Sequence, residues 1–398
     1  MKSFAPQGRS GKTVEEPSYD WGERRAGKAF LALHDGTIFR GWSAGADCDR
    51  LGEVVFNTGM TGYEEILTDP SYSGQLVAMT YPEIGNTGIN HDDHESRQLF
   101  AEGLIVHQMN QPSNWRSVRS LSDYLRASGV PAIVGVDTRA LTVKLRTEGT
   151  ARGYLAVTGR VGEDEAVRRA RDWCGLDGQD YAARVSAEQA FEWDGDGHIS
   201  TTWPDQDRLP AADLTVAAYD FGIKWNILRR LRQQGIAVRV VPAGTSAKDI
   251  LELETDGLFL SNGPADPAAV TYAIDNIRSL LGRLPIMGIC LGHQLLGLAL
   301  GGRTYRLKFG HHGCNHPVKD LTTGKVEITS QNHNFSLDPD SLPPDEMEIT
   351  HINLNDDTVE GIRHRKCPAF SVQYHPEAAP GPHDAGYLFA RFRELMSG

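Results

Sequence analysis

The sequence predicts an α/β protein in which a strand-rich mixed α/β domain precedes a C-terminal doubly wound, mostly parallel sheet. From about residue 214 onward, apolar runs of strand length alternate with segments of helical periodicity, which indicates parallel strands joined by crossover helices. Before residue 160, strand-like runs predominate. The chain has 398 residues, more than one hydrophobic core usually serves, so two domains are expected.

The first domain, residues 28–160, begins with a predicted β-hairpin over 30–40. Asp35-Gly36 lies between two apolar runs there, and this dipeptide favours the tight turn of a hairpin. Short apolar runs predict further strands at 54–56, 76–80, 103–106 and 132–136. Apolar residues at helical spacing predict helices at 120–128 and 139–147.

Residues 161–212 are predicted to be a linker region. A charged helix over 163–173 is followed by a loosely patterned polar stretch that ends in Pro204 and Pro210, which is typical of a connection between domains. Residues 1–27 are polar and lack the apolar core of a signal peptide, so we expect a flexible extension there.

The second domain, residues 213–398, is expected to gather its functional groups at one edge of its sheet. Strands are predicted at 214–219, 237–241, 257–260 and 285–289, with helices beginning near Trp225, Ser246 and Ala268. Ligands of such sheets bind at the carboxyl ends of the strands. Asn262-Gly263 and Cys290 both directly follow predicted strands.

Cys290 lies where an apolar strand turns into a helix, in Gly288-Ile289-Cys290-Leu291-Gly292. Glycines two positions before and after remove the side chains that would crowd a tight strand-to-helix turn, as in the nucleophile elbow of hydrolases. The sulfur would then lie at a helix N-terminus, where the helix dipole favours a negatively charged group. A small buried cysteine is the alternative interpretation of this residue taken alone.

His375 and Glu377 make the catalytic interpretation of Cys290 the stronger one. They follow an apolar strand-like run and are separated by Pro376, which keeps His375 out of the helical region. Residues i and i+2 of an extended chain share a face. The carboxylate can therefore orient the imidazole, whose other nitrogen is free to accept a proton from sulfur.

With this trio the chain resembles the triad class of glutamine amidotransferases, in which Cys290 matches the nucleophile, His375 the base and Glu377 the orienting carboxylate. The fold implied by that resemblance is the class I glutaminase fold. Within the class, the chain resembles the small-chain family of carbamoyl-phosphate synthetase over roughly residues 28–395. The matching segments are 56–63, 69–72, 81–86, 135–139, 219–227, 261–267 and 308–313.

The resemblance implies a glutaminase subunit that hydrolyses glutamine through a cysteine thioester and passes ammonia to a large synthetase subunit. That partner would make carbamoyl phosphate for the arginine and pyrimidine pathways. ATP and magnesium are expected on the large subunit, and no cofactor is expected on this chain. The small-residue turn at 85–88 is a candidate wall of the ammonia exit.

Glutamine contacts are implied at Gly59, Gly263, Ala265, Leu291, Gln294, Asn332, Asn334 and Phe335. The backbone N–H groups of Leu291 and Gly263 would stabilise the oxyanion. Gln294 lies four residues after Cys290 and so shares its helix face. Some family members have a serine at the position of Gly59, and Ala265 and Asn334 replace glycines.

The composition limits which binding partners and which cellular location are expected for this chain. A formal charge of −12 argues against nucleic acid or an acidic membrane surface as a partner. No apolar run reaches the length of a membrane span. Five cysteines without a CxxC pair do not form a disulfide framework, so a reducing, cytoplasmic location is expected.

Other functions are less consistent with the sequence. His311, His312, Cys314 and His316 lie within six residues, but no second ligand pair is apparent, so we expect polar packing at a domain or subunit contact and no metal. The intact trio argues against a binding scaffold without activity. A hydrolase of γ-glutamyl compounds would share the carbonyl chemistry, yet it has no evident use for the N-terminal domain.

Overall fold

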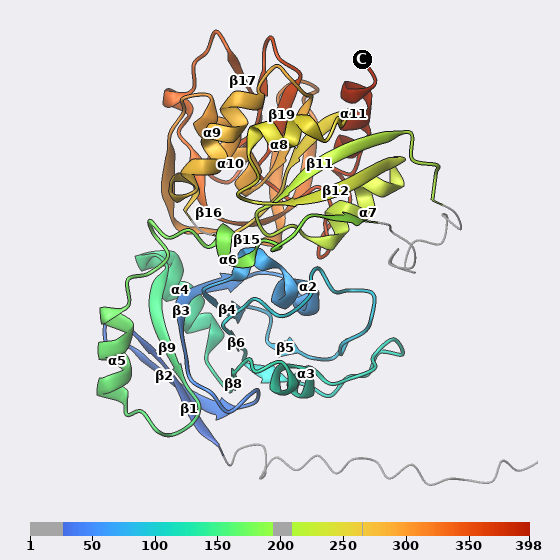
Figure 1. Cartoon of the computed structure of the whole chain (residues 1–398). Helices are drawn as coiled ribbons and strands as arrows, with labels where there is room; N and C mark the ends of the chain where they lie inside the picture. The colour runs from blue at the N-terminus through green and yellow to red at the C-terminus, as the bar shows by residue number, and fades with distance from the viewer. Residues whose placement is uncertain (1–26, 194–208, 265) are drawn as a thin grey trace, which may run out of the picture.

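The computed structural model describes residues 27–193, 209–264 and 266–398 (Figure 1). Apart from Gly27, the predicted extension lies outside the described residues, as does the predicted glutamine contact Ala265. Within the described ranges, no helix has the length and apolar character needed to cross a bilayer.

The N-terminal domain is a closed β-barrel, drawn in blue and blue-green in Figure 1. The predicted hairpin joins β1 (Lys28–Leu33) to β2 (Ile38–Ser43), with Gly36 of its turn at φ 99°. The other barrel strands are β3 (Arg50–Asn57), β4 (Gln75–Met79), β6 (Gly103–Ile105), β8 (Ala132–Val134) and β9 (Ala151–Ala156). In the order β1-β2-β8-β6-β4-β3-β9, β9 pairs back with β1, and closure leaves no unpaired edge.

Helices cover the barrel on two sides. Ser120 and Asp137 cap the predicted helices α3 (Leu121–Ala127) and α4 (Thr138–Glu148), because each side chain accepts a hydrogen bond from the N–H three residues on. Between β3 and β4 the chain forms α2 (Tyr63–Thr68) and the 3-10 turn η1 (Pro70–Tyr72). The short strands β5 (Glu83–Ile84) and β7 (Gln108–Met109) pair with each other.

The described part of the predicted linker forms three elements that pack on both domains. α5 (Glu163–Asp172) lies along β1 and β9 and buries Ala166 and Ala170 against them. α6 (Ala182–Val185) contributes Ala182 to the core of the second domain. β10 (Phe191–Trp193) pairs antiparallel with β12 (Ile236–Pro242) at the edge of the second sheet.

The C-terminal domain contains the predicted doubly wound parallel sheet. Its parallel strands are β12, β11 (Leu214–Asp220), β13 (Gly257–Leu260), β14 (Ile286–Ile289) and β19 (Ala369–Val372), in that spatial order. An antiparallel extension follows β19, formed by β18 (Val359–His364), β17 (Met347–Asn353), β15 (Thr304–Asp320) and β16 (Val326–Leu337). The sequence analysis did not identify these four strands.

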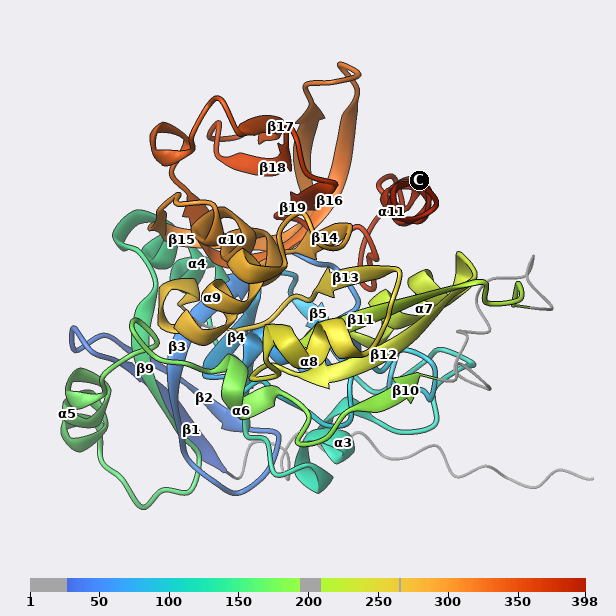
Figure 2. The same ribbon diagram turned by 45° about the horizontal axis from the view of Figure 1, so that its top comes forward.

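Helices cover both faces of the parallel part (Figure 2). α7 (Trp225–Gln233) and α11 (Tyr387–Met396) pack on one face, around a core that includes Leu231 and Phe389. α8 (Ala247–Glu252), α9 (Thr271–Leu280) and α10 (Leu291–Ala299) pack on the other face. The turns η2 (Pro267–Ala269) and η3 (Pro339–Ser341) complete the described elements of this domain.

The barrel meets the second domain at the carboxyl ends of its parallel strands. Asn262, just after β13, donates from Nδ2 to Ser71 Oγ at 2.9 Å. The N–H of Trp225, after β11, donates to the carbonyl oxygen of Glu95 at 2.9 Å. Ligands of doubly wound parallel sheets bind at this edge, and here residues of the N-terminal domain cover it.

We expect Phe389→Ala to lower the free energy of unfolding by about 3–5 kcal/mol, because its fully buried ring packs between α11 and the sheet. Phe191→Ala is the matched control: this ring is 40% exposed and should cost no more than about 1 kcal/mol. Denaturant titration followed by circular dichroism measures both. Equal losses would contradict the assigned core.

Candidate active site

Cys290 lies on a strained turn between β14 and α10. Its backbone has φ 52° and ψ −106°, a conformation that costs a non-glycine residue roughly 1–3 kcal/mol. A Cβ at Gly288 would lie 2.8 Å from the carbonyl oxygen of Gly292, and one at Gly292 would lie 2.2 Å from that of Leu260. The two glycines are therefore required for the close packing of helix on strand, as the sequence predicts for a nucleophile elbow.

The structure brings the three predicted catalytic residues together in the interior. His375 Nδ1 lies 2.6 Å from Glu377 Oε1. Cys290, His375 and Glu377 are all buried, with exposed fractions of 2%, 3% and 0%. The other imidazole nitrogen, Nε2, makes no hydrogen bond of good geometry with a described residue. That nitrogen is available to the sulfur, which contacts the carbonyl oxygen of Asn332 at 3.5 Å.

The electrostatics of this trio favour a charged imidazole. Burial opposes the charge on His375, but the Glu377 carboxylate and the Cys290 side chain outweigh it and raise the pKa of His375 to about 10. Burial likewise opposes the charge on Glu377, but Lys224 and His375 lower the pKa of that carboxyl to about 2. At neutral pH the pair is therefore a carboxylate and an imidazolium.

Lys224 is a site residue that the sequence analysis missed. It lies between β11 and α7 and is only 2% exposed, and its Nζ donates to Glu377 Oε1 at 3.0 Å and to the carbonyl oxygen of Ala378 at 2.8 Å. Removing one partner of such a buried pair costs about 3–5 kcal/mol. A single lysine after a strand carries no local signal of this contact.

A small pocket of about 20 Å³ opens beside Cys290, with room for about one water molecule. Its walls include five further predicted site residues, namely Gly263, Gln294, Asn332, Asn334 and Phe335. The other lining residues are Ser71, Gln75, Leu176, Pro264, Arg306 and His333, of which Pro264 and His333 adjoin predicted contacts. Ser71 and Gln75 come from the barrel, so both domains form the pocket.

The loop that follows β13 packs against the start of α10. A Cβ on Gly263 would lie 2.9 Å from Leu291 Cδ2 and 2.1 Å from the carbonyl oxygen of Phe221, so the loop packs closely here. Neither the N–H of Leu291 nor that of Gly263 donates to a residue in the described part of the chain. Both remain available to an anionic oxygen.

Side-chain amides fix the opposite wall of the pocket. Gln294 Nε2 donates to the carbonyl oxygen of Phe335 at 2.8 Å. His312 lies between two amides, with Nδ1 3.0 Å from Asn332 Oδ1 and Nε2 3.1 Å from Asn334 Oδ1. Burial lowers the pKa of His312 to about 4, so this imidazole is neutral at pH 7.

Gly59, a predicted glutamine contact, is not among the lining residues of this pocket. Its N–H is held by Asn57 Oδ1 at 2.7 Å, in the turn after β3. The hydroxyl that does reach the pocket belongs to Ser71, in η1. The segment 69–72 matches the family pattern in the sequence, but only the fold shows which of its residues lines the pocket beside Cys290.

A second cavity, of about 540 Å³, lies between the domains beside the segment that follows Glu377. Its lining includes Thr61, Glu64, Glu65, Thr87, Gly88, Asp92, Asp93, Glu95, Arg116, Asn226, Arg229 and Ala379 to Gly381. Burial raises the pKa of Glu64 to about 9, and it raises the pKa of Glu95 to about 7 against the influence of Lys224 and Arg229. Near neutral pH, burial thus favours the protonated form of Glu64.

Comparisons with known proteins agree with this architecture. Residues 31–155 match the family described as carbamoyl-phosphate synthase small chain, CPSase domain, and residues 217–395 match glutamine amidotransferase class-I. The carbamoyl phosphate synthase small chain of a Nostoc species is 52% identical over 92% of this chain and 95% of its own length. The carbamoyl phosphate synthase small chain of Rhodopirellula baltica is 52% identical, over 93% of this chain and 96% of its own length.

A plant relative is also similar. The chloroplastic small chain of rice is 47% identical over 92% of this chain and 82% of its own length. Both domains of the fold, and not the amidotransferase half alone, are covered by these matches. The chain belongs to the carbamoyl-phosphate synthase small-chain family, with a class-I glutamine amidotransferase domain as its C-terminal half.

Proposed function

We propose that this chain is the glutaminase subunit of a carbamoyl-phosphate synthase, that it hydrolyses glutamine through a thioester on Cys290, and that it passes the ammonia to a large subunit. The observation that carries the proposal is the buried His375–Glu377 pair, 2.6 Å apart, beside a cysteine on a strained elbow. The imidazole next to the sulfur can accept and return the protons that attack by a cysteine requires.

The reaction proceeds in two half-reactions. The Cys290 sulfur attacks the side-chain carboxamide carbon of glutamine, and the N–H groups of Leu291 and Gly263 stabilise the oxyanion; one such donor is worth roughly 3–4 kcal/mol. His375 gives its proton to the departing nitrogen, so ammonia leaves and a thioester remains. Water then attacks the thioester, His375 accepts the water proton, and glutamate is released.

Glutamine binding is assigned to the pocket walls. Ser71, Gln294 and the backbone near Phe335 offer hydrogen-bonding groups around the attacked carboxamide. The walls of this pocket come from both domains, so glutamine would be held between them.

The larger cavity is the proposed route of ammonia. Thr87 and Gly88 of the predicted exit turn line it, and Asn226 joins its wall to the catalytic trio by donating to the carbonyl oxygen of Glu377. Protonated carboxyl groups such as that of Glu64 do not trap a neutral amine as an ion pair. Ammonia can therefore cross this space uncharged.

We infer a large synthetase subunit as the partner, because a glutaminase that acts alone would not need the N-terminal domain. We assign ATP and magnesium to the large subunit, since the proposed hydrolysis uses only side chains and backbone of this chain. The product would serve the arginine and pyrimidine pathways. All five cysteines are free thiols, which fits a reducing cytoplasmic compartment.

Cys290→Ser is expected to abolish glutamine-dependent synthesis of carbamoyl phosphate by the complex with the large subunit, while ammonia-dependent synthesis persists. Free ammonia bypasses the thioester, and the synthetase sites lie on the other subunit. Parallel assays with glutamine and with ammonium chloride measure the difference. Loss of both activities together would argue against the assigned role.

Glu377→Gln should slow hydrolysis less than His375→Asn does, because Glu377 orients and charges the imidazole without reacting. Since Glu377 raises the pKa of His375, its loss should lower that pKa and move the alkaline limb of kcat/KM to lower pH. Glu346→Gln, at an exposed carboxylate, is the control and should leave the profile unchanged. An unshifted alkaline limb in Glu377→Gln would disprove the coupling.

Thr61→Trp should raise the ratio of glutamate formed to carbamoyl phosphate formed, because a bulky ring at this exposed wall narrows the larger cavity. Gly88 is a poorer choice: at φ 70°, a Cβ there would lie 2.0 Å from Ser117 Oγ and deform the loop. Thr147→Trp, on the exposed side of α4, is the control. Equal ratios in both variants would remove this cavity from the ammonia route.

A further inference from the structure

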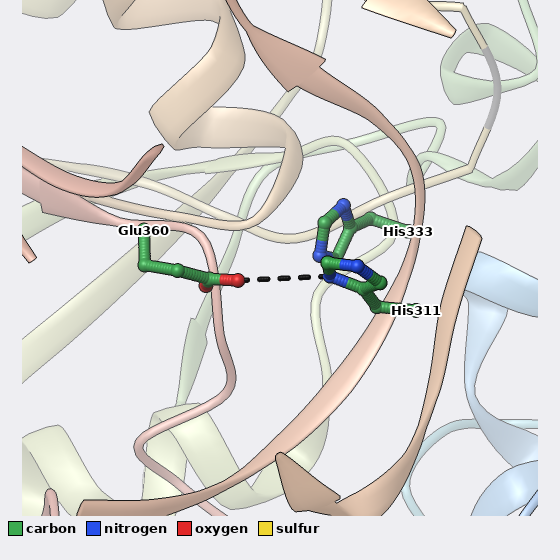
Figure 3. Close-up of side chains that lie close together, drawn as sticks. All are labelled: His311, His333 and Glu360. Carbon is green, nitrogen blue, oxygen red and sulfur yellow. Dashed lines mark ion pairs between the residues drawn. The ribbon is translucent and has the colours of Figure 1, made fainter. Parts of the chain in front are cut away.

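Three buried side chains with metal-binding atoms converge next to the glutamine pocket. They are His311 on β15, His333 on β16 and Glu360 on β18, and one ligand atom from each lies within 4.8 Å of the others (Figure 3). His311 and His333 are direct partners across the β15–β16 ladder, so their rings share a face of the sheet. Glu360 has no exposed surface.

The hydrogen bonds of the two histidines leave one nitrogen of each directed to the shared space. His311 Nε2 lies 2.8 Å from Asp356 Oδ2, and His333 Nδ1 lies 2.7 Å from the carbonyl oxygen of Phe335. Both partners are acceptors, so protons on these two nitrogens would satisfy both contacts. Metal-binding histidines usually donate their second N–H to a carboxylate or a backbone carbonyl in this way.

The two remaining nitrogens both face acceptor oxygens, those of Glu360 and Gln331. His311 Nδ1 is buried and makes no hydrogen bond within the described residues. His333 Nε2 lies 3.0 Å from Gln331 Oε1, while the amide nitrogen of Gln331 donates to Glu360 Oε2, also at 3.0 Å. A neutral imidazole has one proton, and both nitrogens of His333 face acceptor oxygens, so one nitrogen is left against an acceptor in either tautomer. A cation bound at Nε2, with the proton on Nδ1, would relieve this conflict.

We propose that His311 Nδ1, His333 Nε2 and Glu360 Oε1 bind a divalent transition metal of the zinc class. Two imidazoles and a carboxylate are a common donor set for this ion. His311 Nδ1 and Glu360 Oε1 are 3.7 Å apart, close to the edge of about 3.4 Å in a tetrahedral zinc site. Gln331 Oε1 or a water molecule would take the fourth position.

The competing arrangement is a metal-free one in which His311 is doubly protonated between Asp356 and Glu360. Burial opposes this charge, but the two carboxylates raise the pKa of His311 to about 9. Such an imidazolium would form ion pairs with the carboxylates of both Asp356 and Glu360. It would not remove the conflict at His333, whose Nε2 and Nδ1 both face acceptor oxygens. This arrangement predicts that no metal binds.

Occupancy of the site would affect the glutamine pocket through one carbonyl group. The carbonyl oxygen of Phe335 accepts from both His333 Nδ1 and Gln294 Nε2, at 2.7 and 2.8 Å. A metal that fixes the ring of His333 therefore fixes the wall that holds Gln294. This effect on glutamine binding rests on the proposed glutaminase function, whereas metal binding itself does not.

The test is to strip the full chain of metal with a chelator and titrate it with Co²⁺, a spectroscopic substitute for Zn²⁺, in a Cys290→Ser background that removes the reactive thiol. We expect one equivalent to bind with the visible spectrum of a tetrahedral nitrogen and oxygen site. His333→Gln and Glu360→Gln should abolish binding, and Asp356→Asn should weaken it about 10- to 100-fold. His91→Gln, at an exposed histidine, is the matched control and should bind normally.

The outcomes separate the alternatives. Absence of bound metal in the stripped and reloaded parent chain would overturn the proposal in favour of the protonated His311. Binding that survives both His333→Gln and Glu360→Gln would overturn it as well. If either variant fails to fold by circular dichroism, the spectrum of the parent chain decides, since a sulfur charge-transfer band or octahedral spectrum contradicts this donor set. Glutamine KM with and without Zn²⁺, measured with Cys290 intact, then tests the coupling alone.

Discussion

The charge on Glu377 is the constraint on which the rest of the site depends. A carboxylate with no exposed surface is costly to ionise, and Lys224 makes ionisation favourable by donating to it at 3.0 Å. The ionised carboxylate then favours the protonated imidazole of His375. In the proposed mechanism, the charge state of the trio therefore depends on a lysine that does not line the pocket beside Cys290.

That lysine also links the two domains. Glu95 of the N-terminal domain influences the pKa of Lys224, and its side chain accepts from the N–H of Asn226, two residues further on. Any shift of the barrel against the sheet would alter the electrostatic surroundings of Lys224, and through it those of Glu377. The domain interface therefore covers the site and also contributes charged groups to it.

Local patterns in the sequence predicted the parts of the site that are encoded locally. Cys290 was recognisable from the glycines that its strained turn requires, and the strand–helix alternation predicted the parallel sheet. Ser71 and Lys224 were missed because their roles depend on contacts with residues about 150 to 220 positions away. The long strands β15 and β16 were missed because their polar side chains are buried in a hydrogen-bonded network instead of alternating with apolar ones.

The pocket beside Cys290 is assembled from both domains, with Ser71 and Gln75 contributed by the barrel. An amidotransferase half separated from its barrel would lose one wall of its substrate pocket and would expose the charged groups that now lie buried behind the catalytic trio. The two halves are consequently not interchangeable modules.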